Sequence, residues 1–255
     1  MSETFDTRPP RRPDPQRICG LNAVRALFIR RPEQVLRLHY LAERRQVAGP
    51  LCRYLARHHR AYRQVLEDEL ARIAGTEHHG GIVAIAEPRR ALPLPSPPPP
   101  LLFAGPLLPV LDGIGNPHNL GAIARGAAFF GAKAMLLSGD ARQADLSDAA
   151  FRTSEGALEH LTVFRAEDLP SALRRLQGRL LIVGAAASGG VPPEAIPRTK
   201  PIALVMGAEE TGLSAPILAA CEARVTLPGS GLVESLNVAA ATAVLMHALG
   251  SRSSP

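Results

Sequence analysis

Apolar positions in the first third of the chain follow short helical and strand patterns. Apolar residues recur at helical spacing over 20–29, and residues 35–41 alternate as in a half-buried strand. Further helices are predicted at 50–58, with Pro50 at the permitted first position, and at 67–73, with Gly75 as the stop. A brief strand at 64–66 and a buried strand at 81–86 complete the pattern. These elements predict a small α/β domain over residues 17–88.

The pattern after residue 101 is longer and more regular. Strands are predicted at 107–111, 134–137, 161–164, 180–183, 202–206 and 225–227. Helical stretches follow at 119–130, 145–151, 168–176, 216–221 and 235–249. Strands that alternate with helices indicate a mainly parallel sheet with helices on both faces. We therefore predict a second α/β domain over residues 102–255.

Prolines separate the two patterns. Residues 87–100 contain seven prolines, and proline runs behave as stiff, extended spacers. We therefore predict a linker over 89–101, and we expect few contacts to cross it. The N-terminal residues 1–16 are rich in Pro, Arg and Asp and are predicted to be a disordered tail.

Composition narrows the possible classes of protein. The chain is 46% hydrophobic and 20% charged, which is typical of a globular protein with a core. No apolar run is long and charge-free enough for a membrane span and the N-terminus lacks a signal-peptide core, so we expect a cytoplasmic protein. Cys19, Cys52 and Cys221 are widely spaced, which predicts reduced thiols. The histidine pairs at 58–59 and 78–79 have no neighbouring Cys or acid that would complete a metal site, so no metal is expected.

Positive charge is concentrated in the first part of the chain. Residues 1–90 contain 17 Lys and Arg against 10 Asp and Glu, a net charge of +7, whereas residues 91–255 contain 12 against 13, a net charge of −1. This asymmetry indicates a polyanionic partner that the first part contacts. A basic surface without a partner, or Arg codons favoured by a GC-rich genome, is the alternative.

Three strands of the second domain end in turns rich in glycine and polar residues. Gly113 and Gly115 follow the first strand, Gly207 and Glu209 follow the strand at 202–206, and the loop 228–237 follows the strand at 225–227. Open α/β sheets bind small ligands at the carboxyl ends of their strands. A classical NAD site is disfavoured, because the two glycines at 113 and 115 are not followed by the third that the fingerprint requires. Ordinary glycine-rich turns between buried strands are the other interpretation.

The residues around these turns form three motifs. They are Asn116-Pro-x-Asn119-x-Gly121-Ala-Ile-x-Arg125, then Gly207-x-Glu209-x-x-Gly212-Leu, and finally Leu227-Pro-x-x-Gly-x-x-Glu234-Ser235-Leu-Asn237-Val. In this order and separation they resemble the SpoU/TrmH family of RNA 2′-O-methyltransferases, of the knotted SPOUT class. The segment 154–157 is also similar to the family, with Glu155 as a departure. Residues 17–24 and 78–84 resemble the small RNA-binding domain that precedes the catalytic domain in many members.

The resemblance implies transfer of a methyl group from S-adenosylmethionine to a ribose 2′-hydroxyl, with the cofactor held in a C-terminal trefoil knot. Arg125 is then the catalytic residue. Because a guanidinium is essentially always protonated, Arg125 either stabilises a developing alkoxide or loses a proton only when bound RNA reorganises the site. Glu209 could orient it through a charge-assisted hydrogen bond. The implied catalytic positions are Asn119, Arg125, Glu209, Ser235 and Asn237. The implied cofactor contacts are Leu204, Val205, Met206, Gly207, Gly212, Leu227, Ser235, Leu236 and Asn237.

The implied partners are RNA and a second copy of the chain. Family members complete the active site by dimerisation, and the apolar faces of the helix at 235–249 agree, because a helix apolar all round needs more cover than one sheet gives. A catalytically quiet RNA-binding assembly factor of the same fold is an alternative, but Asn119, Arg125, Glu209 and Asn237 are all present. The sequence leaves open whether tRNA or ribosomal RNA is the substrate.

Overall fold

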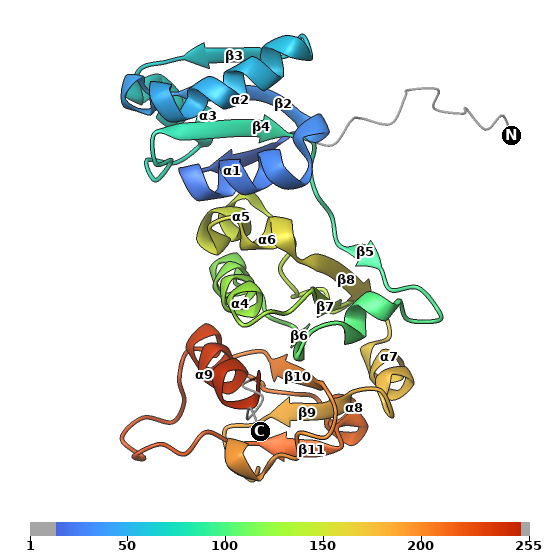
Figure 1. Ribbon diagram of the computed structural model, residues 1–255. Coiled ribbons are helices and arrows are strands. Elements are labelled where there is room, and N and C mark those ends of the chain that lie inside the picture. Colours follow the sequence, from blue (N-terminus) through green and yellow to red (C-terminus); the bar gives the residue numbers. More distant parts are fainter. Residues whose placement is uncertain (1–13, 251–255) are drawn as a thin grey trace, which may run out of the picture.

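The computed structural model describes residues 14–250 (Figure 1), which contain a four-stranded sheet and a seven-stranded sheet. Most of the predicted tail lies outside the described residues. Gln16, however, is buried and begins strand β1, so the ordered chain starts before the predicted boundary at residue 17.

The front domain is built on the smaller sheet, with strand order β1-β4-β2-β3. Its strands are β1 (Gln16–Cys19), β2 (Val35–Tyr40), β3 (Ala61–Gln64) and β4 (Ile82–Ala86). Its helices are α1 (Leu21–Arg30), α2 (Arg45–Arg57) and α3 (Glu67–Ala74), with single 3-10 turns η1 (Pro32–Gln34) and η2 (Ala42–Arg44). The predicted helix stop is confirmed, since Gly75 adopts a left-handed conformation with φ of 69°.

The predicted start of helix α2 is wrong. The helix begins at Arg45, and Pro50 lies inside it rather than at its first position. Ala48, Cys52 and Leu55 are all buried at helical spacing. The buried face therefore extends to the N-terminal side of the proline, and packing of that face outweighs the local preference of proline for a helix start.

The second domain is a parallel sheet of order β11-β9-β10-β6-β7-β8-β5. Its strands are β5 (Leu92–Pro93), β6 (Leu107–Asp112), β7 (Ala134–Ser138), β8 (Thr162–Ala166), β9 (Leu181–Ala185), β10 (Ile202–Gly207) and β11 (Ala223–Val225). Its helices are α4 (Pro117–Phe129), α5 (Asp148–Ser154), α6 (Ala157–His160), α7 (Leu169–Leu176), α8 (Ala215–Ala220) and α9 (Val238–Gly250), with 3-10 turns η3 (Pro100–Phe103) and η4 (Pro193–Ala195).

Helices cover both faces of this sheet, as predicted. Alternate residues along β10 point to opposite sides: Leu204 belongs to the apolar cluster that includes residues of α4 and α9, and Val205 belongs to the cluster that includes α7 and α8. Both strand residues are fully buried. The trefoil knot itself stays a prediction.

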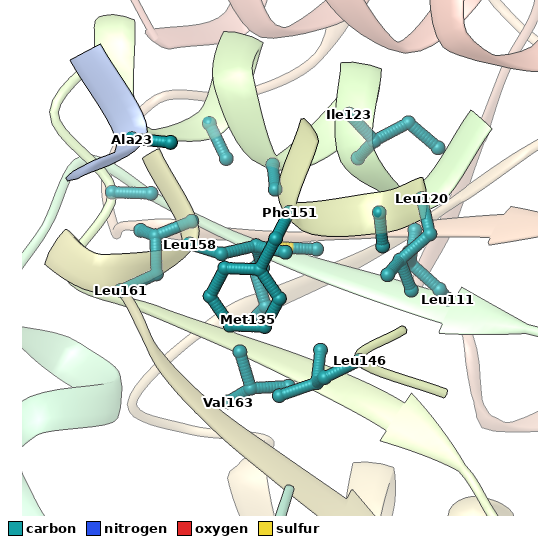
Figure 2. Packing of buried hydrophobic residues seen from close by; sticks show 14 of the residues in the cluster. Ala23, Leu111, Leu120, Ile123, Met135, Leu146, Phe151, Leu158, Leu161 and Val163 are labelled. Carbon is teal, nitrogen blue, oxygen red and sulfur yellow. The ribbon is translucent and has the colours of Figure 1, made fainter. Parts of the chain in front are cut away.

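The expectation that few contacts cross the proline-rich segment is wrong. Strand β5 lies within the predicted linker and pairs with β8, which extends the larger sheet. One apolar cluster also includes residues of both domains, among them Leu27 of α1 and Leu158 of α6. In Figure 2, Phe151 lies in the middle of this cluster, close to Met135 and Leu158 and below Ala23 of the front domain.

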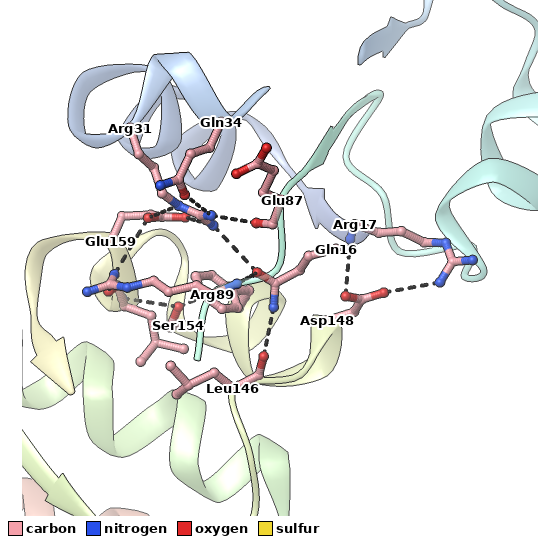
Figure 3. A network of polar contacts seen from close by, with 12 residues as sticks. Gln16, Arg17, Arg31, Gln34, Glu87, Arg89, Leu146, Asp148, Ser154 and Glu159 are labelled. Atoms are coloured by element: carbon pink, nitrogen blue, oxygen red, sulfur yellow. Dashed lines mark hydrogen bonds and ion pairs between the residues drawn. The ribbon is translucent and has the colours of Figure 1, made fainter. Parts of the chain in front are cut away.

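Polar contacts reinforce this junction (Figure 3). The Arg31 guanidinium donates to both carboxylate oxygens of Glu159, each at 2.9 Å, and the two side chains are 8% and 0% exposed. Arg89, from the predicted linker, donates to the carbonyls of Leu158 and Leu161. Local sequence patterns do not reveal such pairings, because the partners are about 70 to 130 residues apart.

Glu155, the departure from the family segment, also belongs to this junction. It ends helix α5 in a left-handed conformation with φ of 51°, and its carboxylate accepts a hydrogen bond of 3.0 Å from the Asn22 amide. The next residue, Gly156, lies so close to α1 that an added Cβ would be 2.9 Å from the Ala26 Cβ. Glu155 therefore contacts the front domain.

Candidate active site

Three loops converge at the carboxyl edge of the larger sheet. Strands β10 and β6 are paired in register, with Gly207 opposite Asp112. The loop after β10 therefore leaves the sheet beside the loop that leads into α4. The third loop, 226–237, follows β11 and leads into α9. Each loop carries one of the three sequence motifs.

Asn119, Glu209 and Asn237 come together where these loops meet. The Glu209 Oε1 atom accepts hydrogen bonds from the Asn119 amide at 3.0 Å, from the Asn237 amide at 2.9 Å and from the Val238 backbone N–H at 3.2 Å. The Asn237 amide also donates to the Asn119 side-chain oxygen at 3.2 Å. One carboxylate thus joins residues that are 90 and 28 positions away in the sequence.

Asn237, rather than Ser235, caps the last helix. Helix α9 begins at Val238, three residues later than the predicted start. The Asn237 side-chain oxygen accepts from the backbone N–H groups of Ala239 at 3.0 Å and Ala240 at 3.3 Å, as an N-cap residue does. Both ends of the Asn237 amide are therefore held, which fixes its orientation. Ser235 and Leu236 lie in the exposed loop before the cap.

Arg125 is not part of this cluster. Its side chain is exposed on α4, and the described partners of Glu209 are the two asparagines and the Val238 N–H. Arg125 lies six positions after Asn119 on α4, a rotation about the helix axis of one full turn plus about 240°. The two side chains therefore leave the helix in different directions. The predicted orientation of Arg125 by Glu209 is therefore not seen among the described residues.

The predicted cofactor residues fall into two groups, those in the middle of strand β10, which are buried, and those at its end and in the loops, which are half-buried or exposed. Leu204 and Val205 are fully buried inside the sheet and Met206 is 4% exposed, so the first two can offer a ligand only their backbone. An added Cβ at Gly207 would lie 2.4 Å from the Gly212 carbonyl carbon, so this glycine allows the loop to fold back on itself. Leu227 is half-buried where β11 gives way to the third loop.

The loops nevertheless leave room for a ligand. An added Cβ at Gly189, Gly212, Gly229 or Gly231 would meet no heavy atom of the described chain within 4 Å. Open space therefore lies beside the backbone at these positions, which suits close approach of a nucleoside. The residues present thus fit an adenosine-containing cofactor at this edge of the sheet.

A cavity of about 410 Å³ lies on the other side of the loop after β10. Its polar lining includes Asp112, Ser138, Asp140, Arg142 and Glu167, and the first turns of α7 and α8 supply an apolar wall. The sequence patterns assigned no role to these residues. The only available signal was their position directly after strands, which many turn residues share.

Two carboxylates in this cavity differ in environment. Burial raises the pKa of Asp112 above its usual range, although the Ser138 hydroxyl, which hydrogen-bonds to it, opposes the shift. The Arg142 guanidinium holds Asp140 by hydrogen bonds of 3.0 and 2.8 Å and lowers the pKa of that carboxyl to about 2. Asp140 is thus paired directly with Arg142, whereas Asp112 has the Ser138 hydroxyl and a smaller electrostatic contribution from Arg142.

Neither a metal centre nor a membrane span is found in the described part of the chain. Within residues 14–250, no group of three or more His, Cys, Asp and Glu side chains is arranged to hold a metal ion. The helices of that same range are all too short or too polar to cross a bilayer.

Known families match most of the chain. The SpoU rRNA Methylase family matches residues 106–247, and the RNA 2′-O ribose methyltransferase substrate binding family matches residues 17–92. A 23S rRNA (guanosine-2′-O-)-methyltransferase RlmB from Haemophilus ducreyi is 34% identical over 91% of this chain and 95% of its own length. An uncharacterized tRNA/rRNA methyltransferase, YfiF, from Escherichia coli O157:H7 is 32% identical over 92% of this chain and 68% of its own.

Solved structures agree with these relatives. An AdoMet-bound rRNA methyltransferase from Sinorhizobium meliloti has the same fold, with a TM-score of 0.75 and 23% identity over 92% of this chain and 87% of its own. An RNA 2′-O ribose methyltransferase superposes with a TM-score of 0.73 and 26% identity over 91% of this chain and 86% of its own. The matched motifs, the converging loops and these relatives lead to one conclusion: the chain belongs to the SpoU rRNA Methylase family and is an S-adenosylmethionine-dependent RNA 2′-O-methyltransferase.

Proposed function

We propose that the chain methylates the ribose 2′-hydroxyl of a guanosine in ribosomal RNA. Several relatives that cover most of the chain bear the name of a 23S rRNA (guanosine-2′-O-)-methyltransferase. The observation that carries the proposal is the cluster of Asn119, Glu209 and Asn237, because it gathers polar groups from all three motifs at one point of the sheet edge.

The cofactor, when bound, supplies an electrophilic methyl group on a sulfonium that is a good leaving group. The chain must then hold the acceptor hydroxyl in line with that methyl group and manage its proton. Glu209 fixes the two asparagine amides, and Asn119 in particular presents a side chain that can position the ribose. Leu227, Gly212 and the 228–237 loop are proposed to hold the adenosine, together with the backbone at the end of β10.

Arg125 is proposed to act on the site of a partner protomer in a homodimer. It is exposed and lies outside the cluster of its own chain, so a second chain would be needed to bring a guanidinium to the 2′-oxygen. Helices α4 and α9 also leave large apolar side chains uncovered: Phe129 is 83% exposed and Val244 is 47% exposed. An apolar surface of this kind is typical of an interface.

The front domain is proposed to supply most of the RNA affinity, because the excess positive charge lies in residues 1–90. Helix α2 presents Arg53 and Arg57 to solvent. We further propose that the protein works in the cytoplasm, where ribosomal RNA is accessible. The division into a front RNA-binding domain and a methyltransferase domain remains part of this proposal, with Gln16 in the first and β5 in the second.

The test compares Glu209→Ala with Glu210→Ala. Both residues are exposed neighbours on one loop, but the described contacts to the asparagines come only from Glu209. With ribosomal RNA and labelled S-adenosylmethionine, Glu209→Ala should lose at least about 100-fold in kcat/KM, as loss of a group that positions reactants does. Glu210→Ala should remain close to wild type. Equal activity of the two variants would remove the cluster from the mechanism.

A further inference from the structure

The cavity lined by Asp112 and Arg142 shares only Gly212 with the methyl-transfer site described above, and its other lining residues have no role there. Its volume of about 410 Å³ lies within the range of small-molecule sites and would admit a nucleobase. Two of its walls are apolar and come from the N-terminal turns of α7 and α8, which include Leu169 and Ile217. The remaining lining is mainly polar, with three carboxylates, three hydroxyl groups and one guanidinium.

The charge of the cavity decides what class of ligand it can take. Asp112, Asp140 and Glu167 face one guanidinium, that of Arg142, so anionic groups outnumber cationic ones. A phosphate would be repelled. A metal ion is a poor match as well, because no three described His, Cys, Asp or Glu side chains are grouped to hold one. A neutral group that carries several N–H donors remains as the best match.

Asp112 is the acceptor best placed for such donors. Asp140 is occupied, because it accepts two hydrogen bonds from the Arg142 guanidinium and one from the Arg142 backbone N–H, and Glu167 is exposed. Among the described residues no ion pair involves Asp112, which is half-buried at the end of β6. Arg142 acts on Asp112 only through its charge, since its guanidinium donates to Asp140, so the half-buried Asp112 carboxylate still gains much from hydrogen-bond donors.

The cavity lies beside the catalytic cluster. Thr211 and Gly212 line it and belong to the same loop as Glu209. An added Cβ at Gly113, which lies next to this loop, would approach both the Ala208 Cβ, at 3.7 Å, and the Arg142 guanidinium, at 3.4 Å. One loop therefore turns Glu209 toward the asparagines and Thr211 toward the cavity, so a single nucleotide could reach both sides.

We infer that this cavity receives the base of the target nucleotide, and that Asp112 recognises the adjacent N1–H and N2–H donors of guanine. This inference rests on the proposed function, since it places the target ribose at the Asn119 cluster. Enzymes that modify nucleotides in structured nucleic acid commonly take the target base out of its stack and read its Watson–Crick edge. The Watson–Crick edge of guanine presents two neighbouring N–H donors, which one carboxylate can accept together. Uracil presents one donor between two carbonyl oxygens, and adenine and cytosine present an amine beside an acceptor, so none of these three matches a carboxylate as well.

The experiment uses the full chain and a synthetic RNA that spans the methylated position, once that position has been mapped with the wild-type protein. The RNA carries guanosine, inosine or adenosine at this one position; inosine lacks only the N2 amine. For the wild type, inosine should lower kcat/KM by about 10-fold or more, as loss of a hydrogen bond to a charged acceptor does. Asp112→Asn should lower kcat/KM for guanosine by about 10- to 100-fold and abolish the difference between guanosine and inosine.

Asp168→Asn is the matched control. Asp168 is an exposed carboxylate one residue beyond the cavity wall, and its side chain caps α7 by accepting from the Ser171 N–H. Asparagine caps a helix as well as aspartate, so this variant should keep both stability and the preference for guanosine. Thermal melts and S-adenosylmethionine titrations of all three proteins separate a loss of base recognition from a loss of folding or of cofactor binding.

Three outcomes would overturn the inference. In the first, the wild type methylates guanosine but accepts inosine equally well, which leaves the proposed function intact. In the second, Asp112→Asn weakens binding of S-adenosylmethionine and keeps base preference, so that the cavity serves the cofactor. In the third, no RNA is methylated at guanosine and the wild type does not bind free guanosine more tightly than free inosine in NMR titrations, which overturns the inference together with the proposed function. If guanosine is not methylated but the wild type prefers guanosine over inosine and Asp112→Asn does not, only the proposed function fails and the base site stands.

Discussion

Arg31 and Glu159 form the buried ion pair that joins the two domains, and Arg31→Met tests its contribution to stability. The substitution removes both 2.9 Å hydrogen bonds to Glu159 and a 2.7 Å hydrogen bond to the Glu87 carbonyl. Glu159 would then be a carboxylate with no exposed surface. Loss of one member of a buried pair costs about 3–5 kcal/mol. Because Arg89 remains 3.6 Å from Glu159, we expect the lower end, about 3 kcal/mol of unfolding free energy.

The assay is urea unfolding followed by far-ultraviolet circular dichroism. As a control, Arg63→Met breaks the exposed pair with Glu69 and should change the unfolding free energy by no more than about 1 kcal/mol. The double variant Arg31→Met with Glu159→Leu should recover most of the stability, because the fully buried carboxylate is gone and Arg89, which loses its ion pair, keeps its hydrogen bonds to the Leu158 and Leu161 carbonyls. A decrease below about 1 kcal/mol in Arg31→Met would refute the reasoning, since it would equal that of an exposed pair.

Three further predictions concern activity and binding. Arg125→Ala should bind S-adenosylmethionine nearly as wild type in calorimetry but lose methyl transfer. If Arg125 acts across a dimer, an equal mixture of Arg125→Ala and Glu209→Ala should regain about one quarter of the wild-type rate. In such a mixture half of the dimers contain one chain of each variant, and only one of the two sites in such a dimer is complete. No regain would place Arg125 in the site of its own chain. Val244→Asp should convert a dimer into a monomer in light scattering, and a wild type that is already monomeric at micromolar concentration would contradict the interface. The double variant Arg53→Glu with Arg57→Glu should flatten the plot of log affinity for RNA against log salt concentration. The slope should fall in magnitude by roughly 0.7 to 0.9 for each phosphate that the two arginines no longer neutralise. An unchanged slope would mean that α2 does not bind RNA.

The sequence was sufficient for the longer elements of the larger domain. Its main strands are short apolar runs and its longer helices carry apolar residues at helical spacing, so periodicity identified them in their order along the chain. The start of the last helix was predicted at Ser235, yet the cap is Asn237, because both residue types can cap and only the Asn237 oxygen reaches the free N–H groups. Helix α6 and strands β1 and β5 were missed, since each has at most four residues and gains its stability from tertiary packing.

The site was predictable only as a set of motifs. The resemblance named Asn119, Glu209 and Asn237, and the structure adds that one oxygen of Glu209 holds them together. The cavity at Asp112 could not be predicted, because its lining comes from the ends of four strands that are adjacent only in the folded sheet. The junction at Glu159 was likewise hidden, since its partners lie in the other domain and in the proline-rich segment.

The most direct test of the central claim is the chemical identity of the product. Ribosomal RNA that lacks the modification is incubated with the protein and S-adenosylmethionine bearing a trideuterated methyl group, digested to nucleosides and analysed by mass spectrometry. The wild type should give deuterated 2′-O-methylguanosine, and Glu209→Ala should give none. Deuterium on a base, on the ribose of another nucleoside, or in equal amount with Glu209→Ala would contradict the central claim.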